Sequence, residues 1–130
     1  NKGDFIRSVG HINDVMPTCV ELAATSYPTR FNNEPIHPLE GKSLLPILTG
    51  ENIAVRDSTD VLCWEHLGNK AARKGDWKIV QNKNTADWLL FNLAQDRTES
   101  KDLSNEYPDV KEAIILTYQN WATDVEARTK

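Results

Sequence analysis

The residues best suited to binding a ligand lie in one short segment, residues 62–80. Two apolar, strand-like ends flank a turn that carries His66 and Asn69. A histidine donates or accepts a hydrogen bond according to its tautomer, and an asparagine amide does both. Because loops held by a rigid sheet often carry binding groups, this pair suits the binding of hydroxyls or an oxyanion, although the residues by themselves favour a structural role. The structural alternative places Asn69 in a left-handed turn conformation, with His66 capping the end of the strand.

Basic residues surround and follow this turn. Residues 66–83 carry five Lys or Arg against a single acidic residue, Asp76, whereas residues 1–65 carry nine acidic residues against five basic ones. Such a cluster can steer an anionic substrate toward a site. Alternatively, lysines on a two-stranded hairpin keep its edge soluble, and we favour this second interpretation. The five basic residues are Lys70, Arg73, Lys74, Lys78 and Lys83.

Other residues that support catalysis or metal binding are scattered. His11, His37 and His66 show no HxH or HxxxH spacing, and Cys19 and Cys63 form no CxxC pair, so we predict no metal site in this chain. No nucleophile has an obvious activating base, and we predict no catalytic residue. Both cysteines are expected to be buried apolar thiols. The spacing leaves open whether they form a disulfide.

The composition predicts one soluble globular domain. The chain has 130 residues, of which 39% are hydrophobic and 26% charged, typical of a folded domain. A net charge of -4 argues against a nucleic-acid partner. No apolar run reaches the roughly 20 residues needed to cross a membrane. The chain begins without Met and without a signal-peptide core, so we expect a fragment of a longer protein.

The first half of the chain predicts two helices joined by a surface connection. Apolar residues at helical intervals predict a helix over residues 15–24, with Asp14 as its N-cap and Pro17 in the first turn. Prolines and asparagines predict a surface connection over residues 26–41. A short helix is expected within residues 43–50, where Ser43 suits the N-cap and Gly50 the end.

The second half predicts an antiparallel meander of about four strands followed by a long helix. Short apolar runs separated by Gly or Asn predict strands, and connections this short join antiparallel neighbours. An apolar stripe on the final helix, residues 109–130, must be buried, and the sheet is the nearest partner. The fold class is therefore α+β, with an additional N-terminal helix. The four tryptophans, expected in the core rather than as sugar-stacking platforms, are Trp64, Trp77, Trp88 and Trp121.

The sequence contains four notable blocks, in this order: "GHINDVMPTCVELAATSYP", "PLEGKSLLPILTG", "WEHLGNKAARKGDWKIV" and "WLLFNLAQDRTESKDLS". Together they resemble the C-terminal part of the formylglycine-dependent sulfatases, particularly the bacterial arylsulfatase-like branch. The resemblance extends from about Gly10 to Trp121. In that family the loop matching "EHLGN" borders the active-site pocket, which makes His66 and Asn69 candidates for substrate contact. We still interpret His11 and Asp14 as residues with a structural role at a helix start.

The resemblance implies that residues 1–130 form the C-terminal subdomain of an alkaline-phosphatase-like sulfatase fold. The parent would be a periplasmic or secreted bacterial enzyme that hydrolyses the sulfate ester of a small molecule or glycan. Its N-terminal catalytic domain would hold calcium and a formylglycine made from a Cys/Ser-x-Pro-x-Arg motif, which neither cysteine here matches. This chain alone would be inactive, would bind neither cofactor, and would self-associate through the surface left uncovered.

Two other functions remain open at the level of the sequence. The chain could be a stand-alone module that binds anionic glycans through the basic segment and the "EHLGN" turn. The parent could instead be a related phosphodiesterase or phosphonate hydrolase, which shares the core fold. A Cys/Ser-x-Pro-x-Arg motif upstream would indicate a sulfatase, and a plain Thr or Ser nucleophile would indicate the relative.

Overall fold

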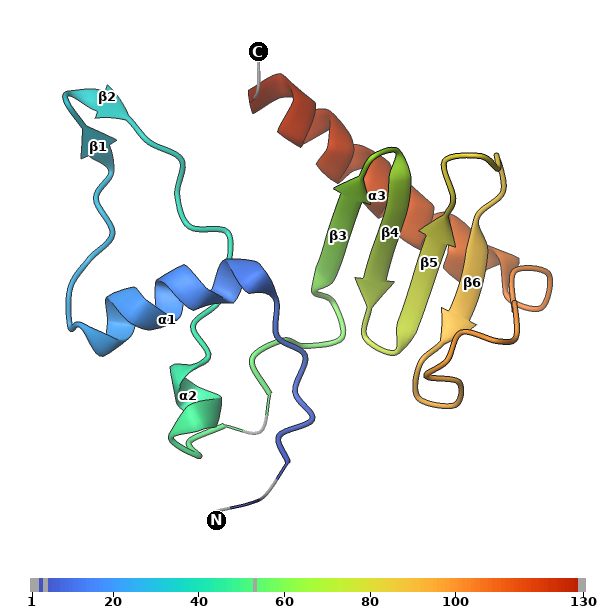
Figure 1. The fold of residues 1–130 in the computed structure, drawn as a ribbon, viewed down its shortest axis with the longest axis horizontal. Coiled ribbons are helices and arrows are strands. Elements are labelled where there is room, and N and C mark those ends of the chain that lie inside the picture. The colour runs from blue at the N-terminus through green and yellow to red at the C-terminus, as the bar shows by residue number, and fades with distance from the viewer. Residues whose placement is uncertain (1–2, 4, 53, 129–130) are drawn as a thin grey trace. The chain divides into compact units, whose positions relative to one another are not determined.

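The computed structural model describes residues 3, 5–52 and 54–128 and divides into two compact units (Figure 1). Unit 1 comprises residues 1–57 and unit 2 residues 58–130. Unit 1 contains the short helix η1 (Ile12–Asp14), helix α1 (Val15–Leu22), a hairpin of β1 (Arg30–Phe31) and β2 (Glu34–Pro35), and helix α2 (Leu45–Leu48). Unit 2 contains strands β3 (Val61–His66), β4 (Asn69–Lys74), β5 (Trp77–Gln81) and β6 (Leu89–Asn92), and helix α3 (Pro108–Arg128).

Unit 1 is organised around the buried carboxylate of Asp14. Arg56 donates two hydrogen bonds to it, from Nη1 to Oδ2 (2.6 Å) and from Nη2 to Oδ1 (2.5 Å). The backbone N–H groups of His11 (2.7 Å) and Lys42 (2.9 Å) donate two more. Burial by itself raises the pKa of Asp14, but the bonds from Arg56, Lys42 and His11 outweigh it and hold that pKa below its usual value. One carboxylate thus ties the start of α1 to two distant segments.

His11 and Asp14 have the structural role at the start of α1 that was expected of them, but their hydrogen bonds differ from the predicted N-cap. Asp14 occupies the N-cap position of α1 without making a side-chain cap. His11 instead caps η1, where its Nδ1 accepts from the Asn13 N–H. Gly41 passes so close to this turn that a Cβ there would lie 2.1 Å from the Asn13 carbonyl oxygen. Only glycine fits at that position.

The structure adds detail to two predictions about unit 1. Helix α1 ends at Leu22 rather than at residue 24, because Ala24 adopts a left-handed conformation (φ 49°) that stops the helix. The predicted surface connection contains the β1–β2 hairpin, whose turn residues Asn32 and Asn33 are both left-handed (φ 50° and 68°). Asparagine tolerates this conformation and therefore suits a two-residue hairpin turn.

The antiparallel four-stranded sheet predicted from the sequence is confirmed. The strand order is β3-β4-β5-β6, and every pair is antiparallel. Figure 1 shows α3 lying across one face of this sheet. Side chains alternate between faces along a strand, so Ala72, Ile79 and Leu90 point toward the helix. They form the core with Ile114 and Tyr118 of α3.

The connection from β6 to α3 is held by two aspartates. Asp102 accepts from the Leu90 and Ser104 N–H groups at 3.0 and 2.9 Å. Asp96 accepts from the N–H groups of Lys101 and Ser100 at 2.8 and 2.7 Å. These bonds, led by that of Lys101, lower the pKa of Asp96 to about 2. A segment that lacks sequence periodicity is thereby given a fixed shape.

The predictions for tryptophans and cysteines hold only in part. Trp77, Trp88 and Trp121 pack against the core as predicted. Trp64 does not, since it lies on the sheet face opposite α3 and its side chain is 36% exposed. Both cysteines are free thiols, and Cys19 is exposed rather than buried. Cys63 is half-buried on the helix side of the sheet, and burial raises the pKa of its thiol to about 11.

Candidate functional site

The predicted binding residues His66 and Asn69 face each other across the β3–β4 turn. They are register partners, and both are exposed. The left-handed conformations fall on Leu67 (φ 51°) and Gly68 (φ 81°), the two central positions of a tight hairpin turn. Asn69 is not among the left-handed residues, which corrects that part of the structural alternative.

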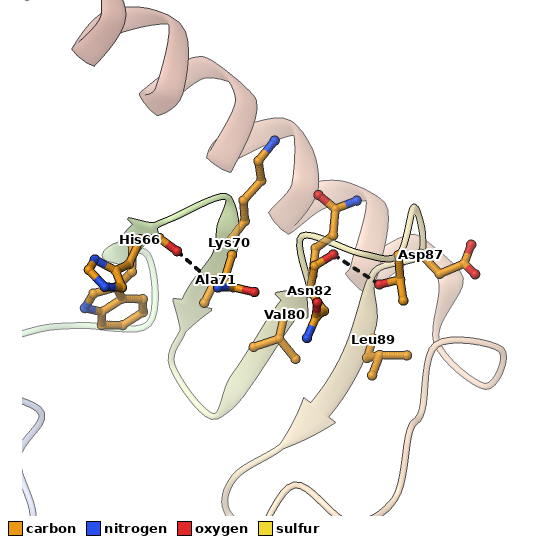
Figure 2. A pocket seen from close by; sticks show the side chains of 11 residues that line it. His66, Lys70, Ala71, Val80, Asn82, Asp87 and Leu89 are labelled. Atoms are coloured by element: carbon orange, nitrogen blue, oxygen red, sulfur yellow. Dashed lines mark hydrogen bonds between the residues drawn. The ribbon is translucent and has the colours of Figure 1, made fainter.

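Asn69 joins two turns at the same end of the sheet. Its Nδ2 donates to the His66 carbonyl oxygen at 3.2 Å, the contact drawn in Figure 2. Its Oδ1 accepts a hydrogen bond from the N–H of Lys83 at 3.1 Å. Lys83 lies in the connection between β5 and β6. An asparagine amide has two donor hydrogens and two acceptor lone pairs, so one of each is left for another partner. The His66 backbone is therefore held in place, while its side chain extends into solvent.

A continuous row of apolar side chains begins beside His66 and crosses the outer face of the sheet. The register pairs Trp64 with Ala71, Ala71 with Val80, and Val80 with Leu89. The row thus contains one residue from each of the four strands. Small side chains occupy its centre and larger ones its ends, which leaves a trough between Trp64 and Leu89.

This trough is a cavity of about 620 Å³, within the range of small-molecule pockets. The apolar row forms its floor, and polar groups from the turns form its rim. Lys70 also lines the cavity, although Figure 2 shows the end of its side chain directed toward α3. The rim residues are His66, Asn69, Asn82, Thr85 and Asp87.

The basic segment does not form one patch. Strand alternation places Lys70 and Lys74 on the face toward α3, whereas Arg73 and Lys78 pair on the outer face. Lys78 is bound to Glu99 at 2.5 Å. Strands β4 and β5 are inner strands of the sheet, so protection of an exposed edge, which we favoured, does not account for these residues.

The described residues contain neither a group of candidate metal ligands nor a membrane-spanning helix. Within residues 3, 5–52 and 54–128, no three His, Cys, Asp or Glu side chains are grouped so that they could hold a metal ion. The helices in these same ranges include none that is both long and apolar enough to span a bilayer. Neither cysteine lies in the motif required for formylglycine. Among the described residues, therefore, no group of side chains fits the calcium ion, and neither cysteine fits the formylglycine, that the resemblance implies for the parent protein.

A curated relative gives the first comparison with known proteins. An uncharacterized sulfatase of Schizosaccharomyces pombe is 29% identical over 108 residues, which cover 80% of this chain and 19% of the relative. The resemblance to sulfatases is confirmed. No family model matches the chain. The chain spans about a fifth of the length of this relative.

Solved structures give the second comparison and show the fold. A Bacteroides thetaiotaomicron protein of glycosaminoglycan metabolism matches 85% of this chain with a TM-score of 0.64 and 16% identity. A protein bound to its substrate D-glucosamine-2-N,6-O-disulfate matches 88% at 0.61 and 15% identity, and a 2-O glycosaminoglycan sulfatase matches 88% at 0.55 and 21% identity. In each case the matched part is 24% of that chain. The chain shares the fold of part of these proteins.

Two features of the structure were not predicted from the sequence. The pair Asp14 and Arg56 is separated by 42 positions, and nothing local signals the contact. The row on the outer face could have been found, because the predicted meander places Trp64, Ala71, Val80 and Leu89 on one face once the turns are positioned correctly. The row was overlooked because Trp64 was predicted to lie in the core with the other large aromatic residues.

Proposed function

We propose that this chain is the C-terminal subdomain of a secreted or periplasmic sulfatase and forms one wall of its substrate pocket. The observation that carries the proposal is sequence similarity to a sulfatase over 80% of the chain. The fold shared with sulfatase structures supports it. The reaction of the whole protein is hydrolysis of a sulfate ester to an alcohol and sulfate. The substrate is a sulfated small molecule or glycan.

In this proposal His66 contacts the substrate directly. Its imidazole extends from the end of β3 at the rim of the trough. A neutral imidazole can donate to, or accept from, a hydroxyl of the leaving group, and an imidazolium can donate to an oxyanion. Because the Asn69 amide holds the His66 carbonyl, the position of the backbone does not depend on the substrate. Such a contact selects among leaving groups rather than breaking the ester bond.

Asn69 has a double role in the same proposal. One hydrogen and one lone pair of its amide hold the two turns together. The remaining hydrogen and lone pair are available for a neighbouring hydroxyl of the substrate. The polypeptide outside this chain supplies the nucleophile, formylglycine, and the calcium ion. The part of this chain is to shape the pocket and not to carry out the chemistry.

The test compares the whole protein with the isolated chain. The whole protein is expected to hydrolyse 4-nitrophenyl sulfate or a sulfated monosaccharide. The isolated chain, with calcium added, is expected to show no turnover above the buffer rate. Release of sulfate is measured by ion chromatography. Turnover by the purified chain contradicts the proposal, and hydrolysis of a phosphate diester but no sulfate ester by the whole protein supports the phosphodiesterase alternative.

The substrate contact predicts a specific effect of replacing His66 with alanine in the whole protein. Loss of one hydrogen bond of about 0.5–1.5 kcal/mol is expected to lower kcat/KM for a sulfated sugar by roughly two- to twelvefold. A minimal aryl sulfate without sugar hydroxyls should be affected less. His37→Ala is the matched control, because His37 is an exposed histidine that is not among the residues lining the trough. Equal losses for both substrates, or for both variants, argue against this contact.

A further inference from the structure

A second cavity, here called the helix-side cavity, lies on the α3 side of unit 2, at the end of the sheet that carries the β4–β5 turn (Figure 1). Lys74, Trp77 and Asn92 line it and are register partners on β4, β5 and β6. Trp77 lies two positions before the core residue Ile79 on β5 and therefore points to the same face, toward α3. Its two partners share that face, because directly opposite residues of an antiparallel pair lie on the same side.

The helix-side cavity has a volume of about 450 Å³, within the range of about 300–1,000 Å³ for small-molecule pockets. Val110 and Ala113 of α3 also line it. An adjoining cavity of about 300 Å³ shares Trp77 and Asn92 with it and extends to Tyr107. The ring centroids of Trp77 and Tyr107 lie 5.0 Å apart, and Tyr107 is 44% exposed. An aromatic pair therefore lies where the two cavities meet.

The β4–β5 turn that borders the helix-side cavity is fixed by hydrogen bonds from both sides. The carbonyl oxygen of Asp76 accepts from the N–H of Leu93 at 2.7 Å. The carbonyl oxygen of Gly75 accepts from the Nε of Arg73 at 2.8 Å. A turn that is already ordered loses little conformational freedom when a ligand binds, so the site is largely preorganised.

The charges around the two cavities do not favour an anionic ligand. Lys74 and Asp76 are the charged residues of the helix-side cavity, and both are exposed. In the adjoining cavity the ammonium of Lys101 is paired with Glu106 at 2.9 Å. The carboxylate of Asp96 there accepts hydrogen bonds from its own loop. A ligand in the helix-side cavity therefore meets one charged donor and one charged acceptor rather than a field of one sign.

We infer that the helix-side cavity binds a neutral sugar ring of a glycan, and that the adjoining cavity holds the next ring of the same chain. A sugar ring presents an apolar face of C–H groups and hydroxyls that both donate and accept hydrogen bonds. Trp77 and Tyr107 offer aromatic surface to the apolar face. Lys74, Asp76 and Asn92 offer donors and acceptors to the hydroxyls. The inference goes beyond the proposed function and does not depend on it, since binding a neutral sugar requires no nucleophile.

Two other classes of ligand fit the helix-side cavity less well. A sulfate group or another anion near Lys74 would also meet the carboxylate of Asp76, two positions along the chain. A wholly apolar ligand would remove water from that ammonium and carboxylate without replacing their hydrogen bonds. On a glycan that also carries sulfate esters, a contact to a neutral ring would raise the effective concentration of those esters at the substrate pocket.

Affinity electrophoresis of the whole protein tests the inference without an activity readout. Native gels are cast with laminarin, galactomannan, dextran or hydroxyethylcellulose, and each mobility is compared with that in a gel without polysaccharide. At least one of these neutral polysaccharides is expected to retard the protein. Lys74→Ala should weaken the binding about tenfold, because it removes a charged donor, and Tyr107→Ala about fivefold. Trp77 is left unchanged because it packs against the core.

Two matched variants control for the loss of a lysine or a tyrosine elsewhere. Lys83 is an exposed lysine in the β5–β6 connection, and Tyr27 is a 37% exposed tyrosine of unit 1. Lys83→Ala and Tyr27→Ala should be retarded like the unchanged protein. The inference is overturned if no neutral polysaccharide retards the protein, or if Lys74→Ala and Tyr107→Ala leave the retardation unchanged. Retardation by dextran sulfate alone overturns it in favour of an anion site. Each of these outcomes holds whether or not the protein hydrolyses sulfate esters.

Discussion

Replacing Arg56 with alanine is expected to lower the free energy of unfolding of unit 1 by about 3–5 kcal/mol. The reason is the environment of Asp14, whose side chain has 0% exposure and forms a buried ion pair with Arg56. Removing the arginine leaves the carboxylate buried with only the backbone donors of His11 and Lys42. The cost of an uncompensated buried charge exceeds that of losing a surface ion pair.

Amide hydrogen exchange can measure this effect in unit 1. The N–H of Lys42 donates to Asp14, and that of Leu44 donates to the hydroxyl of Thr18, so both report on this region. Exchange of these two amides should accelerate by at least a hundredfold in Arg56→Ala. Arg30→Ala is the matched control, because Arg30 is exposed and bonded only locally to the Asn33 carbonyl. If the two variants exchange alike, Asp14 does not organise unit 1.

Replacing Leu90 with alanine is expected to lower the free energy of unfolding of unit 2 by about 2–5 kcal/mol. Leu90 has 0% exposure and packs between the sheet and α3 with Ile79 and Ile114. Truncation removes apolar contacts and leaves a cavity that the surrounding strands only partly close. All four tryptophans of the chain belong to unit 2, so urea unfolding followed by tryptophan fluorescence measures this unit.

The control for this core prediction is Leu116→Ala. Leu116 lies on the same helix that covers Leu90 but is 59% exposed. Alanine also has the highest helix propensity, so the substitution should change the free energy of unfolding by less than about 0.5 kcal/mol. A loss at Leu116 comparable to that at Leu90 would mean that the outer side of α3 is covered by another surface, and the core as described would be incomplete.

The sheet and α3 could be predicted from the sequence because their signals are local. Alternation in the strands, glycine in the turns and the stripe of Val110, Ile114, Tyr118 and Trp121 each act over a few positions. The end of α1 and the β1–β2 hairpin could not be fixed in the same way. They depend on single residues in the left-handed conformation, Ala24 and the two asparagines at 32 and 33, and a pattern of polarity does not specify φ.

The candidate site shows the same limit more clearly. His66 and Asn69 were found because a turn brings them together over three positions. The basic segment appeared to be a single cluster, but alternation divides Lys70 and Lys74 from Arg73. Trp64 is exposed because α3 covers the other face of the sheet. Which face α3 covers depends on packing between residues that are far apart in the sequence. Tertiary contacts therefore decide which polar and aromatic groups remain accessible.

The two thiols differ in a way that is useful for experiments on this protein. Thiolates react with maleimides and thiols hardly do, and Cys63 is both half-buried and protonated at neutral pH because its pKa is about 11. Cys19 is exposed on α1. A fluorescent dye added at pH 7 would therefore attach at one defined point in unit 1, without any engineered cysteine, and its distance to the tryptophans of unit 2 could be followed by energy transfer.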